Sequence, residues 1–158
     1  MRVVPFLALL AALGGCATTA PRPERAPPVD VSGTPAAALG ARAATLATRL
    51  LGAPYRLGGS SPDGFDCSGL VVYVYRQLGV ALPRTAAEQR ATLPRVPLES
   101  LAPGDLVFFS TPSDHVGIYL GGGEFVHAPG QGRGVERARL DSPYFILGYA
   151  GGGRIGGT

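Results

Sequence analysis

The sequence has no lysine, only two cysteines and only two histidines among its 158 residues. All 14 basic residues are therefore arginines, and the net charge of +3 is small and spread along the chain. Since no basic cluster forms the footprint of a nucleic-acid surface, we expect no nucleic-acid partner. No internal repeat is present. The length suits one domain with a sizeable core, behind a removable leading segment.

A long hydrophobic run is also lacking, because the apolar stretch at residues 3–13 is too short to cross a membrane as a helix. It follows a basic start and precedes Gly14-Gly15-Cys16, which is the arrangement of a secretory signal. The segment Leu13–Cys16 resembles a bacterial lipobox, in which the signal peptidase cuts before the cysteine and lipid is attached to it. An ordinary signal with a chance cysteine is the alternative.

The resemblance to a lipobox predicts a lipoprotein signal peptide over residues 1–15 and a lipidated Cys16. Residues 16–33 are rich in Pro, Ala and Arg, so we expect a flexible linker there. The residue after the cysteine is Ala17 and not an aspartate. In this respect the sequence resembles the outer-membrane sorting class of Gram-negative lipoproteins. We therefore expect an exported protein anchored in the outer membrane and facing the periplasm.

This reading leaves Cys67 as the only free thiol. An unpaired cysteine is unusual in an exported protein and indicates a reactive residue. A disulfide between Cys16 and Cys67 is the competing interpretation.

Cys67 stands where a loop becomes a helix. Residues 58–64 are rich in Gly, Ser, Pro and Asp, and the apolar period from Cys67 to Leu78 predicts a helix. Asp66 is a suitable N-cap, which places Cys67 in the first turn, where free backbone N–H groups and the helix dipole favour a thiolate. The alternative is a small buried hydrophobic residue at the start of a core helix.

Helices are predicted in the first half of the chain and strands in the second. Besides the helix at Cys67, we predict a helix over 36–51 with Leu39, Leu46 and Leu50 on one side. A short helix is predicted to end near residue 92, with Thr85 as its cap and Glu88 reaching back to complete a capping box. Residues 93–104 read as an extended connector. Strands are predicted over 105–109, 114–120 and 124–128, with further candidates at 134–139 and 144–150. This order gives an α+β domain with an antiparallel sheet.

The two histidines, His115 and His127, fall in one predicted hairpin. If its turn centres on Gly122, Leu120 lies opposite Glu124 and Gly117 lies opposite His127. The two imidazoles then share one face as diagonal neighbours, about 7–8 Å apart at the backbone. Gly117 would leave room for the His127 ring. A register slip of one residue would separate the histidines.

A cysteine nucleophile needs a base, and the base needs an orienting partner. Cys67, His115 and His127 are the right residue types for these roles, with the Cys67 N–H and the Tyr55 hydroxyl as candidate oxyanion donors. A Cys/His/His metal site is chemically possible, although no ligand pair stands at short spacing. Tyr55 could equally be a packing residue.

Six segments in this order resemble the NlpC-like family of bacterial cell-wall cysteine peptidases. They are residues 54–59 (PYRLGG), 64–71 (GFDCSGLV), 82–86 (LPRTA), 103–109 (PGDLVFF), 115–119 (HVGIY) and 125–128 (FVHA). The resemblance implies a papain-like domain over residues 34–158, with the nucleophile at a helix N-terminus packed on the sheet.

The resemblance also implies hydrolysis of peptidoglycan stem peptides, at D-glutamyl–diaminopimelate or diaminopimelate–D-alanine bonds. It assigns Cys67 as nucleophile, His115 as base, His127 as the third catalytic residue and Tyr55 to the oxyanion or substrate. Asp66 and Ser68 would line the substrate site. No metal or organic cofactor is expected.

The expected partners are peptidoglycan stem peptides, the membrane through the lipid on Cys16, and a regulatory or adaptor protein. Two other functions are compatible with the sequence. One is a catalytically silent lipoprotein that binds the wall or a partner. The other is an amidase or acyltransferase that uses the same cysteine–histidine pair.

Overall fold

The computed structural model describes residues 34–110 and 112–156. The predicted signal peptide, the lipidation site at Cys16 and the linker lie outside these described residues. Among the helices of the described residues, none is both long enough and apolar enough to span a bilayer.

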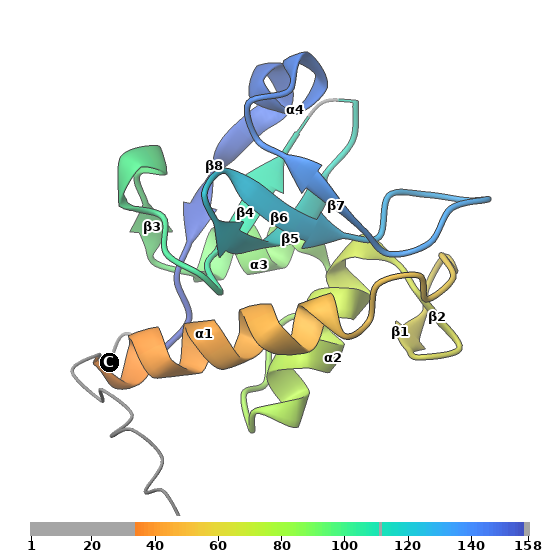
Figure 1. Cartoon of the computed structure of the whole chain (residues 1–158), viewed down its shortest axis with the longest axis horizontal. Helices are drawn as coiled ribbons and strands as arrows, with labels where there is room; N and C mark the ends of the chain where they lie inside the picture. The colour runs from red at the N-terminus through yellow and green to blue at the C-terminus, as the bar shows by residue number, and fades with distance from the viewer. Residues whose placement is uncertain (1–33, 111, 157–158) are drawn as a thin grey trace, which may run out of the picture.

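A six-stranded antiparallel sheet forms the centre of the fold (Figure 1). Its strand order is β3-β8-β4-β5-β6-β7, so β8, the last strand in the chain, lies between β3 and β4. The strands are β3 (Arg95–Val96), β4 (Leu106–Phe109), β5 (His115–Gly121), β6 (Glu124–His127), β7 (Glu136–Arg139) and β8 (Tyr149–Gly153). The predicted α+β class with an antiparallel sheet is confirmed.

Helices precede most of the sheet in the chain, as predicted. They are α1 (Pro35–Thr48), α2 (Cys67–Gln77) and α3 (Ala86–Thr92), with a short 3-10 turn (Leu98–Ser100) and a late α4 (Pro143–Gly148). Figure 1 shows α1 and α2 on one side of the sheet, and both contact β5. A small hairpin leads into α2, and its strands, β1 (Ser60–Ser61) and β2 (Gly64–Phe65), have two residues each.

Two apolar clusters cover the two faces of the sheet. The larger one joins α2 to the strands and includes Leu70, Val71, Val74, Val116, Ile118 and Val126. The smaller one covers the opposite face and includes Val107, Phe109, Phe125 and Leu140. Alternate residues of β4, β5 and β6 enter opposite clusters, because successive side chains of a strand point to opposite faces.

The first helix differs from its prediction. It ends at Thr48 rather than Leu51, and its buried residues are Gly40, Ala43, Ala44 and Ala47. The predicted leucine side is only partly buried. Small residues face the core because the helix lies very close to another segment: a Cβ on Gly40 would collide with the carbonyl oxygen of Pro103.

The predicted strand over 144–150 is wrong in its first part, because residues 143–148 form α4 and β8 begins at Tyr149. Pro143 occupies the first helical position, which its fixed φ suits. Phe145 then packs on Phe109, with ring centroids 5.0 Å apart. The predicted loop over 58–64 and the connector over 93–104 each contain short strands.

Candidate active site

Cys67 is the first residue of α2, and Asp66 caps that helix. The Asp66 carboxylate accepts a hydrogen bond of 2.7 Å from the Gly69 N–H. The predicted N-cap is therefore confirmed. Because the cap fixes the start of the helix, it also fixes the position of the Cys67 thiol relative to the first turn.

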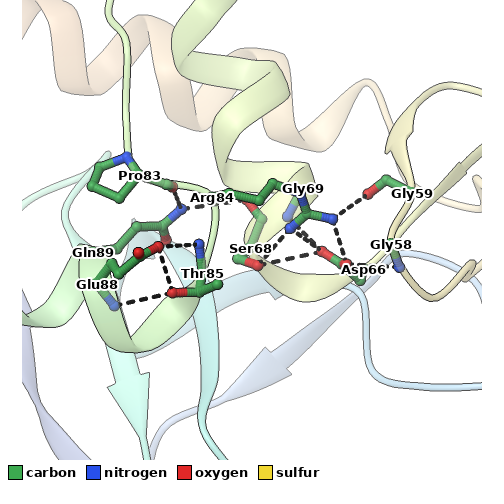
Figure 2. Close-up of polar contacts among 10 residues, drawn as sticks. All are labelled: Gly58, Gly59, Asp66, Ser68, Gly69, Pro83, Arg84, Thr85, Glu88 and Gln89. Atoms are coloured by element: carbon green, nitrogen blue, oxygen red, sulfur yellow. Dashed lines mark hydrogen bonds and ion pairs between the residues drawn. The ribbon is translucent and has the colours of Figure 1, made fainter.

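The Asp66 carboxylate is the centre of a polar network that Figure 2 shows. Arg84 donates to both carboxylate oxygens, at 2.6 and 3.0 Å. The Gly58 N–H donates at 2.9 Å, and the Ser68 hydroxyl donates to Asp66 at 3.3 Å while it accepts from Arg84 at 2.9 Å. Burial opposes the charge of Asp66, but the hydrogen bonds from Arg84 and the Gly69 N–H outweigh it and hold the Asp66 pKa below its ordinary value.

Asp66 and Ser68, predicted to line the substrate site, thus lie beside the nucleophile with their polar atoms held by other groups of the protein. Their role toward substrate stays a prediction. Arg84 was missed as a site residue, although it lies in the matched segment 82–86. Its partner stands 18 residues earlier, so no local pattern reveals the pair.

The Cys67 thiol is free and partly exposed. Burial raises its pKa, and the charge of Asp66 adds to the rise. Backbone N–H groups of Val116, Ser68 and Cys67 lower the pKa without outweighing the burial. The backbone N–H groups at the helix N-terminus thus favour a thiolate, as expected, while burial acts against it.

The two histidines lie together, as the hairpin pattern predicts. The distance from His115 Nε2 to His127 Nδ1 is 2.7 Å, and the rings are nearly perpendicular. The register pairs Ile118 with Val126, the residues adjoining the predicted pair of Gly117 and His127. The shared face of the two imidazoles is therefore confirmed.

Two details of the hairpin prediction are wrong. Glu124 pairs with Gly121 rather than Leu120, because a bulge shifts the register next to the glycine turn. Gly117 makes room for the Phe125 ring and the Val126 carbonyl oxygen, which a Cβ would meet first, rather than for the His127 imidazole.

Both imidazoles are neutral at neutral pH. His127 is 2% exposed, and the rings of Phe125 and Phe145 pack on it with centroids 5.0 and 5.3 Å away. Burial lowers the pKa of His115 to about 4. Burial, the His115 charge and Arg133 lower the pKa of His127 to about 3. A neutral His115 has an unprotonated nitrogen and can therefore act as a base.

Tyr55 lies close to the nucleophile. Burial raises the pKa of its phenol, and the charges of Cys67 and Asp66 raise it further. The phenol therefore stays protonated and can donate a hydrogen bond. The Tyr55 backbone N–H donates to the Arg133 carbonyl at 2.9 Å, which ties the segment before the cysteine to the loop after the histidine hairpin.

Cys67 and the histidine pair meet at the beginning of β5, where the backbone N–H of Val116, the residue after His115, lies against the thiol. Among the described residues, the thiol has no hydrogen bond to either imidazole. Catalytic hydrogen bonds are often long in a free enzyme and shorten when substrate is bound.

A cavity of about 320 Å³ lies beside the histidines. Its lining includes both imidazoles, Arg133, Glu136, Tyr144 and Phe145. A larger groove of about 620 Å³ lies between α1 and α2, but none of the predicted catalytic residues lines it. The smaller cavity is therefore lined by the histidine pair, whereas Cys67 and Tyr55 do not line it.

Within residues 34–110 and 112–156, no three His, Cys, Asp or Glu side chains are grouped so that they could hold a metal ion. The histidine nitrogens that face each other are also only 2.7 Å apart, a hydrogen-bond distance.

The sequence of residues 52–154 matches the model of the NlpC/P60 family. Murein DD-endopeptidase MepH of Escherichia coli (strain K12) is 44% identical over 113 residues, which are 66% of this chain and 42% of the relative. The gamma-DL-glutamyl hydrolase of Bacillus subtilis (strain 168) is 49% identical over 88 residues, 52% of this chain and 21% of the relative.

A crystal structure of an NlpC/P60 family protein from Bacillus cereus ATCC 10987 has a TM-score of 0.70 and 37% identity. The match covers 77% of this chain and 41% of that one, and it confirms the predicted papain-like fold. The chain spans less than half the length of all three relatives. The family match and these likenesses show that the chain belongs to the NlpC/P60 family, the cysteine peptidase family that its motifs resemble.

Proposed function

We propose that this protein is a peptidoglycan endopeptidase that hydrolyses amide bonds of stem peptides. One observation carries the proposal: a capped helix N-terminus holds a free thiol beside a buried, hydrogen-bonded pair of neutral imidazoles. The names of two relatives, a murein endopeptidase and a glutamyl hydrolase, agree with a substrate of this class.

In the proposed mechanism, Cys67 is the nucleophile and His115 is the base. Because Nε2 of His115 faces His127, its Nδ1 takes the thiol proton while sulfur attacks the amide carbonyl. The Cys67 N–H and the Tyr55 hydroxyl stabilise the oxyanion. Collapse to a thioester expels the amine, which receives the proton from His115. Water, activated by His115, then hydrolyses the thioester and restores the thiol.

The bond that is cut is either D-glutamyl–diaminopimelate or diaminopimelate–D-alanine. On both sides of these bonds the substrate carries carboxylates. Arg133 lines the cavity beside the histidines with a side chain that is 61% exposed, and an arginine fork suits a carboxylate. We therefore place a carboxylate-bearing residue of the substrate in this cavity, with Asp66 and Ser68 bordering the other side of the nucleophile.

Digestion of purified peptidoglycan tests the proposal. The protein and its Cys67→Ala variant are incubated with intact sacculi and with isolated muropeptides, and the products are analysed by mass spectrometry. We expect cleavage within stem peptides by the unchanged protein only, and the product masses identify the bond. Cleavage between glycan and peptide would instead establish an amidase.

Two outcomes contradict the endopeptidase. If neither protein cleaves either substrate, although the thiol of the unchanged protein reacts with a maleimide and the fold is intact, the simple enzyme is excluded, which leaves a binder or an enzyme that needs an activator. If the Cys67→Ala variant is as active as the unchanged protein, the thiol is not the nucleophile.

The proposed location rests on the sequence alone. We propose that residues 1–15 direct export, that Cys16 carries lipid in the outer membrane, and that residues 16–33 tether the catalytic domain to reach the wall. A Cys16→Ser variant tests this. We expect it to lose incorporation of labelled palmitate and to leave the outer-membrane fraction; unchanged labelling would contradict the anchor.

A further inference from the structure

His127 has one ring nitrogen without a hydrogen bond. Its Nδ1 faces His115, but its Nε2 is buried and has no partner among the described residues. The nearest acidic oxygen is Oε1 of Glu136, at 3.6 Å. This is slightly too long for a hydrogen bond. Glu136 is also the residue directly opposite His127 in the pairing of β6 with β7, so the backbone fixes the two side chains as neighbours.

The proton between the two imidazoles can be placed in two ways. In the first, Nε2–H of His115 donates to Nδ1 of His127, so Nδ1 of His115 is unprotonated and His127 carries its proton on Nε2. In the second, Nδ1–H of His127 donates to Nε2 of His115, so His115 carries its proton on Nδ1. Only the first arrangement leaves His115 free to accept the thiol proton.

The Glu136 carboxylate distinguishes the two arrangements. In the first it faces an N–H donor on His127 Nε2, which it attracts. In the second it faces a nitrogen lone pair, which it repels, and that lone pair has no donor. An ionised carboxylate only accepts hydrogen bonds, so Glu136 favours the first arrangement.

We propose that Glu136 is a positioning residue that acts through His127 and keeps His115 in the tautomer that accepts a proton. The order is then Cys67, His115, His127, Glu136. The inference rests on the proposed catalytic roles of the first three residues. The tautomers of the histidines can be measured without any activity, so the proposal for Glu136 can fail separately from the endopeptidase proposal.

Arg133 is the other charged group at this position, since it forms an ion pair with the same Oε1 of Glu136. Its side chain is 61% exposed, whereas the Glu136 side chain is 33% exposed. The remaining neighbours that pack on His127 are the phenylalanines Phe125 and Phe145. If Arg133 turns toward a substrate carboxylate, Glu136 is released to approach His127. The proposed step therefore couples substrate binding to the tautomer of the base.

The first experiment is NMR of protein labelled with ¹⁵N at histidine. The chain has only two histidines, so four ring nitrogens give the whole spectrum, and long-range proton–nitrogen correlations identify the tautomers. We expect Nε2–H on both rings. Glu136→Ala should give a mixture of tautomers, and Glu136→Gln, which keeps an acceptor oxygen, should retain more of the original one.

The second experiment measures kcat and KM on the peptide that the unchanged protein cleaves. Glu136→Ala should lower kcat by roughly tenfold or more, with KM changed less than about twofold, because the wrong tautomer removes the base but not the binding surface. Glu136→Gln should recover part of kcat. A rise in KM alone would show that Glu136 only binds substrate, and the proposal would be wrong.

Two controls separate the proposed role from others. Glu124 on the same hairpin also pairs with an arginine, Arg137, but it does not line the histidine cavity; Glu124→Ala should leave the tautomers and kcat unchanged. Arg133→Ala removes the side chain that competes with His127 for the Glu136 carboxylate. This variant should keep the Nε2–H tautomer of both histidines. If Arg133→Ala gives the same tautomer mixture as Glu136→Ala, or if Glu136→Ala leaves both tautomers intact, the proposal is overturned.

Discussion

The active site has two sides that are held by different physical means. On the cysteine side, Asp66, Ser68 and Arg84 satisfy one another with charge-assisted hydrogen bonds. On the histidine side, aromatic rings surround His127 and one of its nitrogens lacks a partner. The first side fixes a geometry, since several bonds converge on one carboxylate. The second keeps two bases neutral by excluding water.

This difference suits the two tasks of a thiol peptidase. The nucleophile must be placed accurately, and a capped helix whose cap is itself held by Arg84 does that. The base must be unprotonated and oriented, and burial provides the first property while the neighbouring imidazole provides the second. The same burial raises the pKa of Cys67. In the proposed mechanism, the proton is accordingly transferred during attack rather than beforehand.

The largest expected difference between the two sides is in acid. The folded-state pKa values of His115 and His127, about 4 and 3, lie below the ordinary 6.5. The unfolded chain therefore binds more protons below about pH 6.5, and the free energy of unfolding falls as pH falls from there to about 4. The slope is at most about 1.4 kcal/mol per pH unit for each group. Asp66 contributes below its ordinary 3.8 only.

Urea unfolding at a series of pH values measures this loss. A His127→Asn variant, which has one fewer titrating imidazole, should show a flatter dependence between pH 6.5 and 4. Equal slopes for the two proteins would mean that His127 is not held neutral in the fold.

The next largest effect is expected on the cysteine side. Arg84→Ala leaves the Asp66 carboxylate, whose side chain is 12% exposed, without its cation. Because the Arg84 side chain is itself 41% exposed, the expected loss in the free energy of unfolding lies below that of a fully buried pair, at about 2 to 3 kcal/mol. Arg90 is the matched control, because its contact with Asp114 is 3.9 Å long and both side chains are exposed; Arg90→Ala should cost less than about 0.5 kcal/mol. Equal losses would refute the structural importance of the network.

The sequence predicts those parts of both sides that depend on local patterns, and it misses those that depend on tertiary contacts. The cap at Asp66, the capping box of Thr85 and Glu88, and the shared face of the histidines are local or follow from a two-residue period, and all three are confirmed. The groups that lie against Arg84 and Glu136 belong to other elements. Their roles depend on tertiary contacts that no spacing along the chain encodes.

The errors in the fold have the same origin. Residues 144–150 contain Tyr, Phe and Ile, which favour strands, yet Pro143 and the packing of Phe145 on the sheet make the first part helical. In α1 the leucines suggest a buried face, but the close approach to Pro103 requires small residues there. In both cases tertiary packing overrides the local preference.

A smaller effect is expected at Gly117. A methyl group there would collide with the Phe125 ring, which packs on His127 with a centroid distance of 5.0 Å. Gly117→Ala should lower the free energy of unfolding by about 2 kcal/mol, a usual cost of overpacking, and displace the histidine side without changing the Asp66 network. In a Phe125→Ala background the same substitution should cost less, although the Val126 carbonyl oxygen would still lie 2.9 Å from the added carbon. An unchanged cost there would mean that Phe125 is not the obstacle.

The smallest effect on stability is expected at Phe145. A substitution at this position tests most directly whether aromatic packing keeps His127 neutral. This residue lies on α4, and its ring packs edge-on against His127, 5.3 Å between centroids. Phe145→Ala should cost about 1 kcal/mol, because the side chain is only partly buried. It also lets water reach the imidazole, so the pKa of His127 should rise from about 3 toward 6.5, as an NMR titration of the two histidines would show. Leu147 on the same helix is 86% exposed, and Leu147→Ala should leave the pKa of His127 unchanged. If Phe145→Ala also leaves it unchanged, packing by this ring is not what keeps the second imidazole neutral, and the backbone and Phe125 must supply the burial instead.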